Sequence, residues 1–285
     1  MQLTSIAAVL LLSGAAHAAN DLNSVILRTT EQMERELGGR NYDINSSFTE
    51  DLHYGDACCI PATNGGKTMC VAAVAEVLIR TLNEVGKEVS EVFVKFPISH
   101  WKQSKYLNIR PHLYQFKGVQ SRGPGDALSR FGIGEIVPFD RMLGGDVLAF
   151  SRLNGSGHAV IFRRYIDANK HTVANYSPQV VGFEYFSAQS STRGVGRRLA
   201  YFGQVGSSRC PAYAPQGADC GIIRASFANA GRLWSPERWT VDASIAALKT
   251  RFVRNASRGG AISTDRIKEL LDADIAPVYG VDFKE

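Results

Sequence analysis

The 285-residue sequence has no long apolar run after residue 18. A helix that crosses a bilayer needs about 18 or more consecutive apolar residues. The sequence therefore predicts a mature chain without a transmembrane segment.

Motifs of several other protein classes are also absent. No Cys-x-x-Cys, His-Glu-x-x-His or calcium-loop spacing occurs, so neither a metal nor another cofactor is implied. The lack of a Gly-x-Ser-x-Gly elbow argues against a serine hydrolase of that type. The net charge of +5 is spread along the chain without a basic run that carries interleaved aromatics, so nucleic acid is not an expected partner.

Residues 1–18 are typical of a secretory signal peptide. An apolar run from Ile6 to Leu12 precedes Ala16-His17-Ala18, a small-x-small cleavage pattern, although no Lys or Arg precedes the run. We expect an exported protein, periplasmic or extracellular. Its positive charge suits anionic surfaces such as cell-wall polymers or phospholipid head groups.

Cysteine is scarce and its count is odd. The five are Cys58, Cys59, Cys70, Cys210 and Cys220. In an oxidising compartment thiols that can meet form pairs, so at least one thiol stays without an intramolecular partner. A disulfide could close the loop between Cys210 and Cys220, which leaves the spare thiol among the other three. A bridge between adjacent Cys58 and Cys59 would close a strained ring, so one of them could take a distant partner, and the connectivity stays open.

The hydrophobic pattern predicts an α+β fold with N-terminal helices and a multi-stranded antiparallel sheet. Helices are expected over residues 21–37 and from Met69 to about Val85, with Thr68 as N-cap of the second. Turn signals separate expected strands at 146–152, 158–166 and 171–176, and the strand-like segments "GFEYFSA" and "RRLAYFGQV" extend the sheet.

We divide the chain into three regions. Residues 1–18 form the signal peptide, residues 19–205 the main domain with its N-terminal helix, and residues 206–285 a C-terminal helical extension. Helical patterns in the extension run from about Val241 to Val253 and from Thr264 to Leu271.

Cys70 lies in the first turn of the second expected helix. Unpaired backbone N–H groups and the helix dipole would stabilise a thiolate there, which a cysteine nucleophile needs. The same position suits a buried core cysteine, because Cys70 shares a helix face with Val74, Val77 and Leu78.

His158 is the best candidate for a base beside such a thiolate. It follows the turn "NGSG" and opens the strand "HAVIF", which would hold an imidazole at a sheet edge. The alternative is an ordinary surface histidine at a turn. The remaining histidines after residue 18 lack this setting: His53, His100, His112 and His171.

An orienting group for the imidazole is expected on the third strand. Asn175 is the first choice, but a plain hairpin closed at "DANK" would set Gln179 opposite His158, so Gln179 stays as the second choice. Asn64, on a Gly-rich loop before Cys70, could supply an oxyanion-hole amide beside the backbone N–H of Cys70. Gln189 or Arg193 could meet a substrate carboxylate from one wall of the cleft, although a solvated polar segment is the simpler interpretation of both positions.

The segments "MCVAAVAEVL" and "GGDVLAFSRLNGSGHAVIF" together resemble the papain-like cysteine hydrolases of the NlpC and CHAP type. In that superfamily a Cys opens a helix, and a "GD" strand is followed by a "GH" strand that bears the base. The resemblance covers about Gly55 to Gln179. It implies Cys70 as nucleophile, His158 as base and Asn175 as polar third member. The segment before Cys70 lacks the Asp-Cys-Ser/Gly pattern common in the NlpC branch, so subfamily and substrate stay open.

Such families mostly cleave amide bonds in the stem peptides of peptidoglycan, and this is the activity that the resemblance implies here. Two alternatives remain. The same thiol site could transfer its acyl group to an amine, or the chain could be a secreted binding or toxin-like module in which Cys70 is structural.

Overall fold

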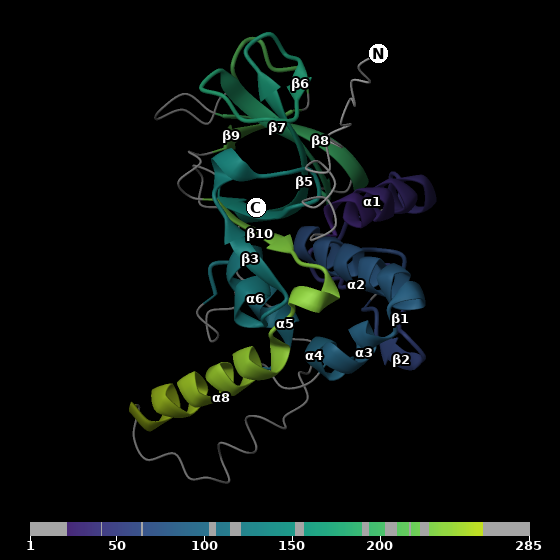
Figure 1. Ribbon diagram of the computed structural model, residues 1–285. Coiled ribbons are helices and arrows are strands. Elements are labelled where there is room, and N and C mark those ends of the chain that lie inside the picture. The colour runs from purple at the N-terminus through teal and green to yellow at the C-terminus, as the bar shows by residue number, and fades with distance from the viewer. Residues whose placement is uncertain are drawn as a thin grey trace, which may run out of the picture.

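The computed structural model describes residues 22–40, 42–63, 65–102, 107–114, 121–151, 157–189, 194–202, 210–216, 218–222 and 228–258 (Figure 1). The expected signal peptide and the expected helix from Thr264 to Leu271 lie outside these residues. Within them, none of the helices combines the length and apolar character that crossing a bilayer requires.

Helices and strands are both abundant, which confirms the α+β class. The helical elements are α1 (Asn23–Leu37), α2 (Cys70–Glu88), α3 (Glu91–Lys95), α4 (Ser99–Lys102), α5 (Ile109–Leu113), α6 (Pro124–Arg130), η2 (Phe139–Arg141), η4 (Pro236–Arg238) and α8 (Val241–Arg258). The strands are β1 (Leu52–Tyr54), β2 (Ala57–Ile60), β3 (Gly134–Val137), β4 (Val147–Ser151), β5 (Gly157–Asp167), β6 (Thr172–Val173), β7 (Val180–Ala188), β8 (Val195–Phe202), β9 (Asp219–Ile222) and β10 (Asn229–Leu233).

The main sheet has the strand order β3-β10-β4-β5-β7-β8-β9, with β6 paired to β5 off this path. Neighbouring strands are antiparallel except β8 and β9, which are parallel. A separate hairpin, β1-β2, lies between α1 and α2 along the chain. The expected strands at 146–152 and 158–166 are confirmed as β4 and β5.

Side-chain alternation along the central strands builds two apolar clusters, one on each face of the sheet. Ala159 and Ile161 of β5 belong to the cluster that contains the buried faces of α1 and α2. Val160 and Phe162 belong to the second cluster, around which β5, β7 and β8 curve (Figure 1). Helices α1 and α2 lie side by side along one side of this curved sheet.

The region after residue 205 contributes to the sheet, so the expected boundary at residues 205 and 206 does not delimit a separate helical extension. Strand β10 lies between β3 and β4, with Ala230 opposite Val137 on one side and Leu148 on the other. Its sequence "NAGRL" escapes pattern analysis because small residues replace the usual β-branched ones. They allow α6 to approach closely, and a Cβ on Gly231 would lie 2.8 Å from the Cα of Gly125. The expected helix from Val241 is confirmed as α8.

The carboxylate of Asp146 joins three distant parts of the chain. It accepts hydrogen bonds from Asn23 Nδ2 of α1 (2.8 Å), from the guanidinium of Arg232 on β10 (2.9 Å to each oxygen) and from the backbone N–H of Leu143 (2.8 Å). The side chain is fully buried. Burial raises the pKa of the Asp146 carboxyl, whereas these donors, Arg232 first, act to lower it. Gly145 (φ +101°) permits the close approach, because a Cβ there would lie 2.5 Å from the carbonyl oxygen of Asn23.

We expect Asp146→Asn to destabilise the fold by roughly 3 kcal/mol, because Arg232 would lose its ionic partner in a largely buried setting. Urea unfolding followed by circular dichroism measures the change. Asp140→Asn is the matched control, since Asp140 is exposed. Equal unfolding midpoints for the two variants would show that the buried carboxylate is not a stabilising anchor.

Candidate active site at the start of helix α2

A pocket lies where the start of α2 meets the end of the β4-β5 hairpin. It is lined by residues of α2, β4 and β5 and by the end of α5: Cys70, Val71, Leu113, Tyr114, Ala149, Gly157, His158 and Ala159. The pocket is small, with room for about one water molecule, and it opens to solvent. Cys70 and His158, the predicted nucleophile and the predicted base, thus line the same pocket although 88 residues separate them.

Cys70 is the first residue of α2, and its side chain is nearly buried, at 8% exposure. The expected N-cap is wrong by one position, because Met69 occupies it in an extended conformation and no side chain caps the helix. The hydroxyl of Thr68 instead donates to the carbonyl oxygen of Ser47 (2.8 Å). First-turn N–H groups therefore lack a side-chain cap beside the thiol, and together with the helix dipole they favour a thiolate.

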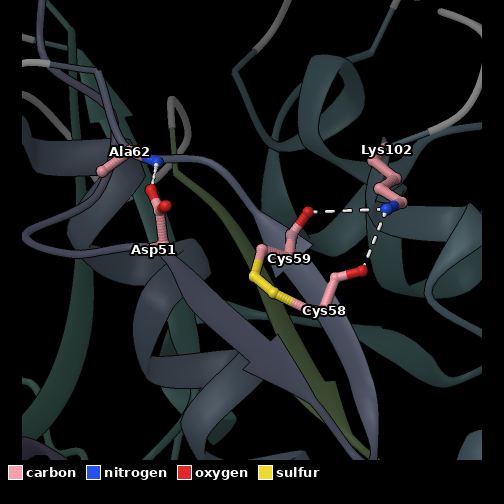
Figure 2. The surroundings of a disulfide bond; sticks show 5 residues. All are labelled: Asp51, Cys58, Cys59, Ala62 and Lys102. Carbon is pink, nitrogen blue, oxygen red and sulfur yellow. Dashed lines mark hydrogen bonds between the residues drawn. A yellow bond between two sulfur atoms is a disulfide. The ribbon is translucent and has the colours of Figure 1, made fainter.

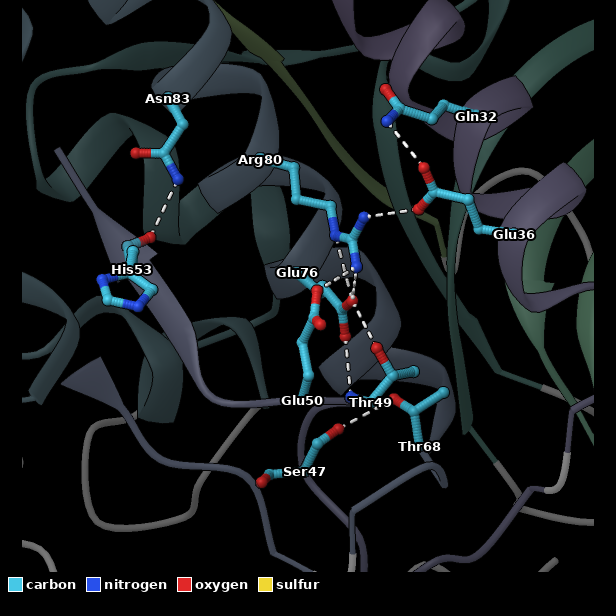
Figure 3. Close-up of polar contacts among 10 residues, drawn as sticks. All are labelled: Gln32, Glu36, Ser47, Thr49, Glu50, His53, Thr68, Glu76, Arg80 and Asn83. Carbon is cyan, nitrogen blue, oxygen red and sulfur yellow. Dashed lines mark hydrogen bonds and ion pairs between the residues drawn. The ribbon is translucent and has the colours of Figure 1, made fainter. Parts of the chain in front are cut away.

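A buried ionic network fixes the chain that leads into α2. Glu76, six residues after Cys70 on α2, is fully buried and accepts hydrogen bonds from the N–H (3.0 Å) and the hydroxyl (2.7 Å) of Thr49. Arg80 pairs with Glu76 (2.9 Å) and reaches Glu36 and Glu50 as well (Figure 3). The segment before the helix is therefore held against α2, and the position of Cys70 is set by packing and charge together.

His158 is the second residue of β5 and lies opposite Phe150 of β4. Its ring packs edge to face against Phe150 (centroids 5.6 Å apart) and against Tyr185 of β7 (5.7 Å). Only 6% of the residue is exposed, so it is not the surface histidine that was the alternative interpretation. Gly157, His158 and Ala159 all line the pocket, so the pocket runs across this end of β5.

The cysteine pairing is resolved. Cys210 and Cys220 form the disulfide that the sequence suggested, with a sulfur–sulfur distance of 2.01 Å. Cys58 and Cys59 are bonded to each other (Figure 2), so neither takes a distant partner. Cys70 is the one of the five cysteines that takes part in neither disulfide.

The structure does not bring Asn175 or Gln179 to His158, so both expected third residues are wrong. The expected third strand shrinks to the two residues of β6, which pair with Tyr165 and Ile166. The nearer of the two, Tyr165, is seven residues along β5 from His158, roughly 23 Å away. Asn175 and Gln179 are exposed in the connection between β6 and β7.

Strand β7 is the long partner of β5 on this side, and it contributes groups that the sequence did not identify. The hydroxyl of Tyr185, whose ring contacts His158, lies 2.7 Å from Oε1 of Gln189 and 3.1 Å from Oδ2 of Asp219. Tyr185 lies inside the strand-like segment "GFEYFSA", where an aromatic residue is usually part of the apolar core. Asp219 lies on β9, whose parallel pairing with β8 leaves no signal in local alternation.

The remaining expected site residues have different outcomes. Gln189 was expected to meet substrate, but its side chain bonds to Tyr185 and its N–H donates to the carbonyl oxygen of Gly194 (3.1 Å). It is not among the described residues that line the pocket. Asn64 and Arg193 lie outside the described residues.

Comparisons with family models, with curated proteins and with solved structures find no match to this chain. Function must therefore be inferred from the chemistry of the pocket itself. A thiol at a helix N-terminus and an imidazole are the two groups that nucleophilic cysteine catalysis requires, and Cys70 and His158 both line this pocket. The ring of His158 packs against Phe150 and Tyr185, which belong to the apolar cluster on the sheet face opposite α2.

We expect one reactive thiol per native chain, because the other four cysteines are paired. Alkylation with iodoacetamide without reductant, followed by peptide mass analysis, should modify Cys70 alone. Cys70→Ser should remove all labelling. Labelling of Cys58 or Cys59 in the unreduced native protein would contradict this pairing.

Proposed function

We propose that the chain is an exported papain-like cysteine hydrolase that cleaves an amide bond. The observation that supports this most is the pocket that Cys70 and His158 share at the N-terminus of α2. Cys70 also takes part in neither of the two disulfides. The resemblance of "MCVAAVAEVL" and "GDVLAF...GHAVIF" to the NlpC and CHAP type points to the same chemistry.

In this proposal His158 takes the proton of the Cys70 thiol, and the thiolate sulfur attacks the carbonyl carbon of the amide. The tetrahedral intermediate collapses when the C–N bond breaks, and the imidazolium gives its proton to the leaving amine. A water molecule then attacks the thioester with His158 as base. The carboxylic acid leaves, and the thiol is regenerated.

The uncapped start of α2 suits the negative charge that develops on the carbonyl oxygen. Cys70 and Val71 both line the pocket, and their N–H groups belong to the first turn, where intrahelical acceptors are lacking. Backbone donors of this kind stabilise an oxyanion when they are fixed before reaction. The buried Glu76 network, which fixes the approach to α2, supplies that rigidity.

Tyr185 takes the positioning role that the sequence assigned to Asn175. Its ring supports one side of the imidazole, and its hydroxyl is held between Gln189 and Asp219. A ring fixed at both its face and its hydroxyl restricts the orientation of His158 more firmly than an exposed amide could.

Peptidoglycan stem peptides are the proposed substrate class. The net charge of +5 favours association with anionic cell-wall polymers, and the expected signal peptide would deliver the chain to them. Two disulfides suit an oxidising compartment.

Purified protein should release peptide fragments from peptidoglycan, identified by mass. Cys70→Ala and His158→Ala should each lower kcat/KM by at least about a thousandfold, because nucleophile and base act as one unit. His171→Ala is the matched control, since His171 is exposed at the turn between β5 and β6.

Different products would separate the alternatives. Joined peptides that depend on Cys70 would indicate acyl transfer to an amine. If neither peptidoglycan nor a general protein substrate changes, and His158→Ala leaves the alkylation rate of Cys70 unaltered, the hydrolase proposal fails and a binding module is favoured.

Tyr185→Phe should lower kcat by roughly tenfold, equivalent to about 1.4 kcal/mol, while KM and the urea midpoint stay near the parent values. The ring packing on His158 is kept and only the hydroxyl is lost. The acidic limb of the kcat pH profile should also move, because that limb reports the base. Asn175→Ala and Tyr176→Phe are the controls and should leave the profile unchanged. An unaltered profile in Tyr185→Phe would show that the tyrosine only fills space.

A further inference from the structure

The small hairpin β1-β2 carries three metal-binding side chains on its surface. His53 of β1 and Cys58 and Cys59 of β2 have ligand atoms that all lie within 4.8 Å of one another. His53 and Cys58 are exposed and Cys59 is half-buried. Sequence motifs did not reveal this group, because the hairpin turn, and not helical spacing, brings His53 to the cysteine pair.

The backbone beneath these side chains is anchored from both strands. Asn83 of α2 donates to the carbonyl oxygen of His53 (2.8 Å; Figure 3) and accepts from the N–H of Gly55 (2.9 Å). On the other strand, Lys102 of α4 donates to the carbonyl oxygens of Cys58 (3.4 Å) and Cys59 (3.5 Å), as Figure 2 shows. The donor set is therefore carried on a fixed platform and not on a loose loop.

Strand alternation turns His53 outward. Its neighbour Tyr54 is buried, with its ring 5.1 Å from that of Phe93 and 6.2 Å from that of Trp101. The hairpin is thus packed on its inner side, while the imidazole and the sulfur atoms face the other way, where an ion can reach them.

We propose that Cys58, Cys59 and His53 form a redox-gated binding site for a thiophilic divalent ion such as Zn²⁺. In the disulfide form the sulfur atoms are bonded to each other and offer no thiolate. A dithiol reductant supplies two electrons and two protons, is itself oxidised to a disulfide, and leaves two free thiols. The ion then displaces both thiol protons, and the neutral imidazole donates a lone pair without losing a proton.

The donor set selects the class of ion. Two thiolates and one imidazole are soft or borderline ligands, which suit Zn²⁺ and Cd²⁺ and not Mg²⁺ or Ca²⁺. Water completes a four-coordinate shell at such a three-ligand site.

This site shares no residue with the pocket of Cys70. Asn83, which holds the hairpin, is 13 residues along α2 from Cys70, or about 20 Å along the helix axis. Metal binding can therefore be tested whether or not the chain proves to be a hydrolase.

The test uses the full chain with Cys70→Ser, which removes the free thiol. After mild reduction by a dithiol, alkylation and peptide mass analysis of a sample establish that the pair 58–59 is open and that the pair 210–220 is closed. The reductant is removed and Cd²⁺ is titrated, with the ultraviolet thiolate-to-cadmium charge-transfer band as readout. We expect one ion per reduced chain and none per oxidised chain.

Adding His53→Ala should weaken Cd²⁺ binding at least about tenfold, whereas adding His171→Ala, the matched exposed histidine, should not change it. Cys58→Ser and Cys59→Ser should each abolish the band expected for two thiolates. His53 is exposed, so its loss leaves the packing of the hairpin intact. Equal affinity in His53→Ala and the parent, or no binding by the reduced chain, would overturn the proposal.

Discussion

The buried carboxylate of Asp146 is the constraint on which the placement of the other elements depends. It lies directly before β4, and its partners come from α1 at one end of the described chain and from β10 near the other. A fully buried charge is tolerable only when its hydrogen bonds are complete, so Asn23, Leu143 and Arg232 must all be in place at once. These hydrogen bonds of Asp146 thus fix the β4-β5 hairpin, and with it His158, relative to both α1 and β10.

A second buried carboxylate, Glu76, positions the other half of the site. Through Thr49 it ties the chain before α2 to the helix, and through Arg80 it connects to Glu36 on α1 and to Glu50. Helix α1 therefore takes part in both networks, with Asn23 near its start and Glu36 near its end. The pocket forms where the element held by Glu76 meets the hairpin held by Asp146, so residues of both elements line it, Cys70 and His158 among them.

The parts of the site that the sequence predicted are those with local signals. Apolar periodicity places Cys70 at the start of a helix, and turn residues place His158 at the start of a strand, and both elements are confirmed. The prediction of Asn175 or Gln179 as the group that orients His158 was wrong because strand register depends on pairing between distant segments. After β5 the chain pairs with it over only two residues, in β6, and then forms β7, which is the long partner of β5. No local pattern in "TVANYSPQ" indicates that this segment ends its pairing so early. Likewise, no sequence pattern near Asp146 predicts its ion pair with Arg232, which lies 86 residues later.

The two sulfur sites are chemically separate although helix α2 contacts both of them. Cys70 begins α2 and lines a pocket between helix and sheet, where it is nearly buried and apolar neighbours limit access. Cys58 and Cys59 lie on a hairpin that Asn83, on a later turn of α2, holds at the surface. Their bond to each other withdraws two thiols that could otherwise exchange with Cys70.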